Sequence, residues 1–218
     1  MYDTCFERLA SWATGPRFEP EIAEARSEFF AGTGVIHEDD LAFEQRMSGL
    51  SEYYLLDRPL ELDPGGRSPA RLFLFEEGDN LDVSERAAYR SLTHTIHGLF
   101  EVRKIAKETV VVRDLFSRED HRVVERRQVA GMSKGDILEA RLIPWEDNLV
   151  FGRTFVFHPT KARRLILGRI KQLRKKNDAL GADERRQFIW VLARAALICD
   201  RQQQNNRAPP RVELIYGG

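Results

Sequence analysis

The spacing of apolar residues predicts a series of amphipathic helices in the first ninety positions. Residues 2–13 carry apolar or aromatic side chains at intervals of three and four, which is the period of one helix face. Further helices are predicted after Pro20, from Asp39 or Asp40 to Leu56, over residues 70–77 behind Ser68-Pro69, and from Asp82 or Ser84 to Leu92. We therefore expect an acidic helical region over residues 1–97.

The pattern changes at Gly98, where short β-branched or aromatic runs alternate with turn-forming residues. Strands are predicted over residues 99–105, 109–116, 121–125, 137–143 and 149–157. Strands this short and this few hardly make two packed sheets, so a small closed barrel is the economical solution. We expect a five-stranded antiparallel β-barrel, OB-like or SH3-like, over residues 98–159.

Helical spacing returns after the predicted barrel. Thr160 is placed to cap a helix over residues 161–176, and Asp183 a helix over residues 184–203. Residues 212–216 are expected to add a strand or to stay loose. The prediction for residues 160–218 is a basic helical hairpin with a tail. The expected fold class is therefore α+β, with the three regions packed as one cooperative unit.

Composition limits the class of protein and its location. The 218 residues are 42% hydrophobic and 31% charged, which excludes a collagen-like or wholly disordered chain. No eighteen apolar residues follow one another, so no membrane span is predicted. Cys5 and Cys199 lie far apart among apolar neighbours, and we interpret them as buried free thiols in a reducing compartment. We expect a cytoplasmic protein.

The formal net charge of zero conceals an asymmetry along the chain. Residues 1–97 hold 9 basic and 19 acidic side chains, whereas residues 98–218 hold 25 basic and 15 acidic ones. Two explanations fit this distribution. Either the two parts pair within the molecule, or the second part offers a basic surface to a polyanion.

The clearest candidate site is the helix predicted over residues 161–176, which contains no acidic residue. Its candidate polyanion-binding residues are Lys161, Arg163, Arg164, Arg169, Lys171, Arg174, Lys175 and Lys176. Such a row of cations is suited to bind the phosphates of RNA or DNA. A second interpretation is that the row contacts an acidic protein surface. This surface belongs either to a partner or to the region 19–44 of this chain, with Glu21, Glu24 and Glu28. A third interpretation is a plain solvated face. No aromatic residues are interleaved for base stacking.

Two further arginines are secondary candidates for ligand binding. Arg118 and Arg122 fit the pattern R-x-x-x-R, and residues 132–135 read Met-Ser-Lys-Gly, so this stretch resembles a PilZ-type barrel that binds a cyclic dinucleotide. The sequence departs from that pattern at Gly131, where an acidic or amide residue is expected. The arginine pair also falls inside the predicted barrel rather than ahead of it.

No motif predicts catalysis or a bound metal. His94 and His97 have a spacing that suits two metal ligands, but no partner motif accompanies them, so we predict no metal and no cofactor. Residues 131–135 fit G-x-S-x-G in spacing but lead into a strand instead of a helix. The sequence favours a non-enzymatic cytoplasmic binding or adaptor protein that engages an acidic protein or nucleic acid. The alternatives are a regulatory barrel for a small ligand and an unrecognised hydrolase.

Several stretches resemble a group of uncharacterised bacterial proteins, some of which also carry a cysteine-rich SEC-C zinc motif. The stretches are residues 53–60 (YYLLDRPL), 98–102 (GLFEV), 112–116 (VRDLF) and 134–144 (KGDILEARLIP). The resemblance covers roughly residues 25–158 and implies no activity. This chain lacks the cysteine motif, so the resemblance implies no zinc here.

Overall fold

The computed structural model describes residues 2–125, 131–176, 180–205 and 209–217. The helices before the barrel are α1 (Tyr2–Ala13), η1 (Pro16–Phe18), α2 (Glu19–Thr33), α3 (Phe43–Glu52), η2 (Tyr53–Asp57), α4 (Pro69–Glu77), η3 (Gly78–Asn80) and α5 (Val83–Leu92). The strands are β1 (Ile96–Ile105), β2 (Thr109–Asp114), β3 (Asp120–Val124), β4 (Ile137–Trp145) and β5 (Asn148–Phe157). The helices after the barrel are η4 (Thr160–Ala162), α6 (Arg163–Lys176), α7 (Ala182–Gln204) and α8 (Val212–Gly217). The expected α+β fold class is confirmed.

The strands close into a barrel in the order β1-β2-β3-β5-β4, with β1 pairing with both β2 and β4. Four of the ladders are antiparallel, and the ladder between β3 and β5 is parallel. Directions cannot alternate all the way round a closed ring with an odd number of strands, so one parallel pair is unavoidable. The predicted five-stranded barrel is thus confirmed. The parallel ladder between β3 and β5 is the one departure from the predicted antiparallel arrangement.

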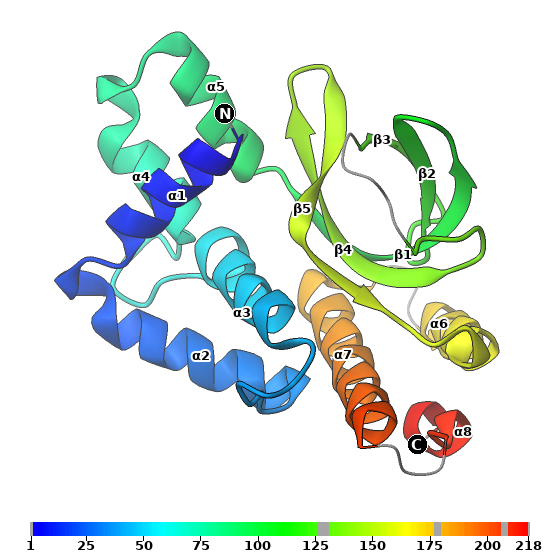
Figure 1. Ribbon diagram of the computed structural model, residues 1–218. Coiled ribbons are helices and arrows are strands. Elements are labelled where there is room, and N and C mark those ends of the chain that lie inside the picture. Colours follow the sequence, from blue (N-terminus) through cyan, green and yellow to red (C-terminus); the bar gives the residue numbers. More distant parts are fainter. Residues whose placement is uncertain (1, 126–130, 177–179, 206–208, 218) are drawn as a thin grey trace.

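Three apolar clusters fill the molecule. One occupies the barrel interior and includes Phe100 and Leu138, both fully buried. A second lies among the N-terminal helices. The third joins one end of the barrel to the C-terminal helices through Leu99, Ile166 and Leu192. Figure 1 shows α7 between the N-terminal helices and the barrel, and it packs against α2, α8 and β1.

The chain end forms helix α8 instead of a strand or a loose tail. Val212 and Tyr216 are four residues apart, so a helix turns both toward the third apolar cluster, where each is buried. The Tyr216 hydroxyl lies 3.0 Å from Nδ1 of the buried His158. Among the described residues, every helix is too short or too polar to cross a bilayer.

The helix predicted from Asp39 or Asp40 to Leu56 begins later than expected and changes its type near its end. Helix α3 begins only at Phe43, and it gives way at Tyr53 to the wider turn of η2, in which the Arg58 N–H donates to the Tyr53 carbonyl at 2.9 Å. The predicted cap is wrong because Asp40 is drawn to Arg201 of α7, with oxygen–nitrogen distances of 2.6 and 2.7 Å. The hydrogen bond from Arg201 lowers the Asp40 pKa to about 2.

Other helix starts follow the sequence in part. Asp82 caps α5 and forms a capping box with Glu85, as its spacing predicts. Thr160 and Asp183 are not caps, since Thr160 lies inside the short helix η4 and α7 already begins at Ala182. Ser68 precedes α4 as expected, but its hydroxyl makes no capping hydrogen bond.

Candidate functional site

Helix α6 presents a cationic face to solvent. Lys161 of the preceding η4 and Arg164, Lys171 and Lys175 of α6 are all exposed, and their spacing places them along one side of this helical segment. From Arg164 to Lys175 this row extends about 17 Å at the rise of an α-helix. The opposite side carries Ile166 and neighbouring apolar residues, which are buried in the third cluster. We call these four cations the α6 face.

The other predicted cations of this segment that the structure describes either contact neighbouring residues or are half-buried. Arg163 pairs with the buried Glu101 of β1 at 2.5 Å. Arg169 donates to the Tyr216 carbonyl at 3.2 Å and lies over the Phe188 ring. Arg174 is half-buried, and the side chain of Lys176 lies outside the described part of the structure.

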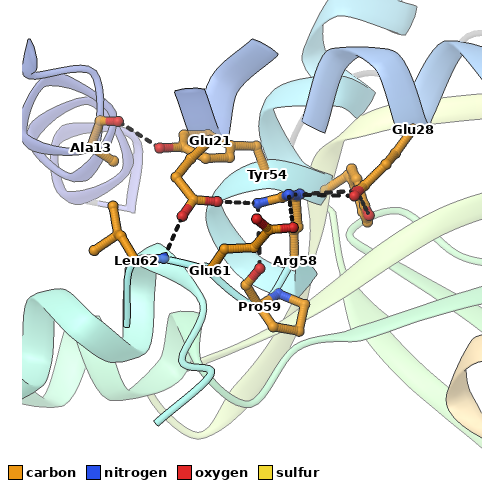
Figure 2. A network of polar contacts seen from close by, with 9 residues as sticks. Ala13, Glu21, Glu28, Tyr54, Arg58, Pro59, Glu61 and Leu62 are labelled. Carbon is orange, nitrogen blue, oxygen red and sulfur yellow. Dashed lines mark hydrogen bonds and ion pairs between the residues drawn. The ribbon is translucent and has the colours of Figure 1, made fainter. Parts of the chain in front are cut away.

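The acidic residues of α2 do not lie against α6. Figure 2 shows Glu21 and Glu28 directed at Arg58, which is itself almost wholly buried. Arg58 Nη1 binds Glu21, and Nε lies 2.9 Å from Glu28. The alternative in which Glu21 and Glu28 cover the basic helix is therefore not realised, because both pair with the buried Arg58.

The two oppositely charged parts of the chain nevertheless pair elsewhere. Besides the pair of Asp40 with Arg201, Arg153 of β5 lies 2.8 Å from Asp3 of α1. Arg141 of β4 binds Glu52 and Asp57, with 3.3 Å from its Nε to Glu52. Internal pairing therefore uses cations outside the α6 face.

The structure places the secondary candidates Arg118 and Arg122 on the barrel surface. Arg118 lies in the turn between β2 and β3 with a left-handed φ of 69°, and Arg122 lies on β3 opposite Val111. Both side chains are exposed. Residues 126–130 lie outside the described residues, and Gly131 and Met132 follow them.

The histidines serve separate local structures. His94 Nδ1 lies 2.9 Å from the Arg90 carbonyl, whereas His97 Nε2 lies 2.9 Å from Oε1 of the buried Glu139. Burial raises the Glu139 pKa, but His97 and nearby cations outweigh burial and lower it. Within the described ranges, no three histidine, cysteine or acidic side chains gather as a metal site would require.

A groove of about 580 Å³ lies between the helical region, strand β1 and the start of α7. Its polar wall includes Ser68, Arg71, His97, Arg185 and Arg186. The groove is separate from the residues that form the α6 face. Neither the charge asymmetry nor any motif of the sequence points to these arginines.

A local signal for this groove is nevertheless present in the sequence. Arg71 lies in the first turn of α4, and Arg185 and Arg186 lie near the start of α7. The helix dipole disfavours cations at these positions, by about 0.3–1 kcal/mol for each exposed charge. Departures from a local rule of this kind concentrate at functional sites.

The fold and these two surfaces define an α+β barrel protein whose helical additions carry clustered cations. The model of a family of unknown function, DUF7986, matches residues 33–193, and the chain belongs to this family. No curated protein and no solved structure matches the chain. The matched region contains the α6 face, which lies beyond the resemblance over residues 25–158, as well as all the lining residues of the groove.

Proposed function

We propose that this protein is a non-enzymatic cytoplasmic binding protein that engages the phosphate backbone of a nucleic acid through the α6 face. The observation that carries the proposal is the row of four exposed cations on one side of η4 and α6, neither of which contains an acidic residue. Glu21, Asp3 and Asp40 of the N-terminal part pair with Arg58, Arg153 and Arg201, not with this row. The row is therefore available to an external polyanion.

Nucleic acid is favoured over an acidic protein by what accompanies the cations. Protein interfaces are built around a desolvated apolar or aromatic core. The exposed side chains of α6 include only cations and Gln172, with Gly168 between them. A phosphate backbone needs no apolar contact, and a row of cations suits it without reading the base sequence.

The cytoplasmic location and the bacterial origin are part of the proposal. Cys5 and Cys199 are both buried free thiols, which supports a reducing compartment. The resemblance of residues 25–158 to bacterial proteins supports a bacterial source.

The salt dependence of binding tests the proposal. The full chain is titrated against a duplex DNA and a duplex RNA of 20 base pairs, with fluorescence anisotropy as the readout. With four phosphate contacts, we expect the logarithm of the DNA affinity to fall with the logarithm of salt concentration with a slope of about −3 to −4. The double variant K171E/K175E is expected to reduce the magnitude of this slope by about 2.

The control variant is K104E/K107E, which makes the same change of charge. Lys104 and Lys107 are exposed at the hairpin between β1 and β2, away from α6. This control is expected to retain most of the affinity. Equal losses in the two double variants, or an unchanged slope in K171E/K175E, would contradict the proposal. Binding to polyglutamate but to neither nucleic acid would assign the α6 face to an acidic protein.

A further inference from the structure

We infer that the groove beside α7 binds a small organic anion that carries a phosphate group. This site is separate from the α6 face and does not depend on the function proposed for it. Among the residues that the structure describes, Arg71, Arg185 and Arg186 line the groove, and Asp57 is the one acidic lining residue. Asp57 is already bound by Arg141, with 2.9 Å between Oδ1 and Nη1. Arg186 is paired with Asp183, 2.8 Å away, so Arg71 and Arg185 are the lining cations that have no ion pair among the described residues.

Two helix starts add to this charge. The residues before and within the first turn of α4, including Ser68, line one side of the groove, and Ala182 at the start of α7 lines another. The first N–H groups of a helix carry a partial positive charge and lack partners within the helix. Asp183 and Glu184 in the first turn of α7 offset part of this charge. Cations beside two helix starts favour a bound anion, and phosphate suits such an arrangement.

An unused hydrogen-bond donor gives an independent indication. Ser68 is only 5% exposed, and its hydroxyl has no hydrogen-bond partner among the described residues. The Nε atoms of Arg185 and Arg186 are likewise buried without a partner in the described part of the chain. Buried donors without a partner are costly and rare, and Ser68 lines the groove, so its hydroxyl indicates a ligand that accepts its hydrogen bond.

The arginines near α7 are held in place before any ligand arrives. The Arg186 guanidinium lies over the Tyr53 and Trp190 rings and is 2.8 Å from Asp183, while the Arg185 guanidinium lies over the Phe116 ring. Planar guanidinium groups held against aromatic rings lose little freedom when they bind a phosphate. Such a site is preorganised for an anion.

The groove also has an apolar part. Leu56, Ile96 and Ile189 line it together with the arginines. Its volume of about 580 Å³ is that of a site for a small organic molecule rather than for a lone ion. A ligand that joins a phosphate to a flat or apolar group, as a nucleotide does, fits this combination.

Thermal stabilisation and calorimetry of the full chain test the inference, with AMP, pyrophosphate, inorganic phosphate and citrate as probes. We expect AMP to raise the melting temperature and to bind more tightly than inorganic phosphate, because only AMP reaches the apolar part. The variant R71Q/R185Q is expected to bind AMP at least tenfold more weakly. Arg71 is exposed, so R71Q alone gives a folded variant should the double variant be unstable.

The matched control is R118Q/R122Q, which removes two exposed arginines from the barrel surface. It is expected to bind AMP as the wild-type chain does. The inference fails if no phosphate compound binds, if citrate binds as tightly as AMP, or if R118Q/R122Q loses AMP while R71Q/R185Q retains it. K171E/K175E is expected to keep AMP binding and R71Q/R185Q to keep DNA binding, so the failure of one proposal is distinguishable from failure of the other.

Discussion

Asp57, the last residue of η2, binds the guanidinium of Arg141 on strand β4 of the barrel. The next residue, Arg58, binds Glu21 of α2 instead. The wide turn of η2 thus directs two adjacent, oppositely charged side chains to different parts of the molecule. Arg141 is only 2% exposed and also holds the buried Glu52.

Replacing Arg141 by leucine should strongly destabilise the protein. The substitution leaves the Glu52 carboxylate buried without its cation, and losses of this kind cost about 3–5 kcal/mol of the free energy of unfolding. Urea unfolding at pH 7 measures the loss. R8A is the control, because Arg8 makes an exposed pair with Glu85 and its removal should cost about 0–1 kcal/mol. Similar losses in the two variants would contradict a special role for the buried pair.

Gly32→Ala should destabilise the protein even though alanine favours helices. Gly32 lies in α2 beneath Trp190 of α7, and a β-carbon there would overlap the indole ring. Overpacking of this kind costs about 1–3 kcal/mol, more than the gain of up to about 1 kcal/mol in helix propensity. G168A is the matched control, since Gly168 in α6 is exposed with no atom within 4 Å of the added carbon. It should raise stability, and a rise in G32A as well would show that α2 and α7 are not packed this closely.

The stability of the protein should fall between pH 6.5 and pH 4 because of His158. Burial lowers the pKa of His158 from 6.5 to about 4. The unfolded chain therefore binds a proton in this range that the folded chain does not, and stability present above pH 6.5 is lost as the pH falls through about 4. The expected loss is about 2–3 kcal/mol.

Urea unfolding of the wild-type chain and H158Q across pH 7 to 4 isolates this contribution. Glu139 and Arg46 lie near His158, and His158 in turn helps to lower the Glu139 pKa, so the difference between the two chains reports His158 together with its interaction with Glu139. The advantage of the wild type should shrink by about 2–3 kcal/mol toward pH 4. A difference that stays constant would show that His158 is not a buried neutral histidine.

The sequence determined the local structure of this protein well. The change from helical spacing to β-branched runs at Gly98 marks the start of the barrel to within a few residues, since β1 begins at Ile96. The cationic helix after the barrel was also readable, because its cations and its apolar stripe lie within sixteen residues. Such features depend on side-chain period and backbone propensity, which act over a few residues and are written in consecutive positions.

Only the tertiary structure decided which charges are free and which are used. Glu21 and Arg58 are 37 residues apart, and Asp40 and Arg201 are 161 apart, so nothing in their local sequence predicts that they pair. The groove likewise joins Arg71 with Arg185 and Arg186 from helices on either side of the barrel in the chain. Ion pairs depend on distance and burial, and folding sets both only when remote segments meet. Some charged side chains of this neutral protein therefore pair inside the molecule, whereas the cations of the α6 face remain exposed to solvent.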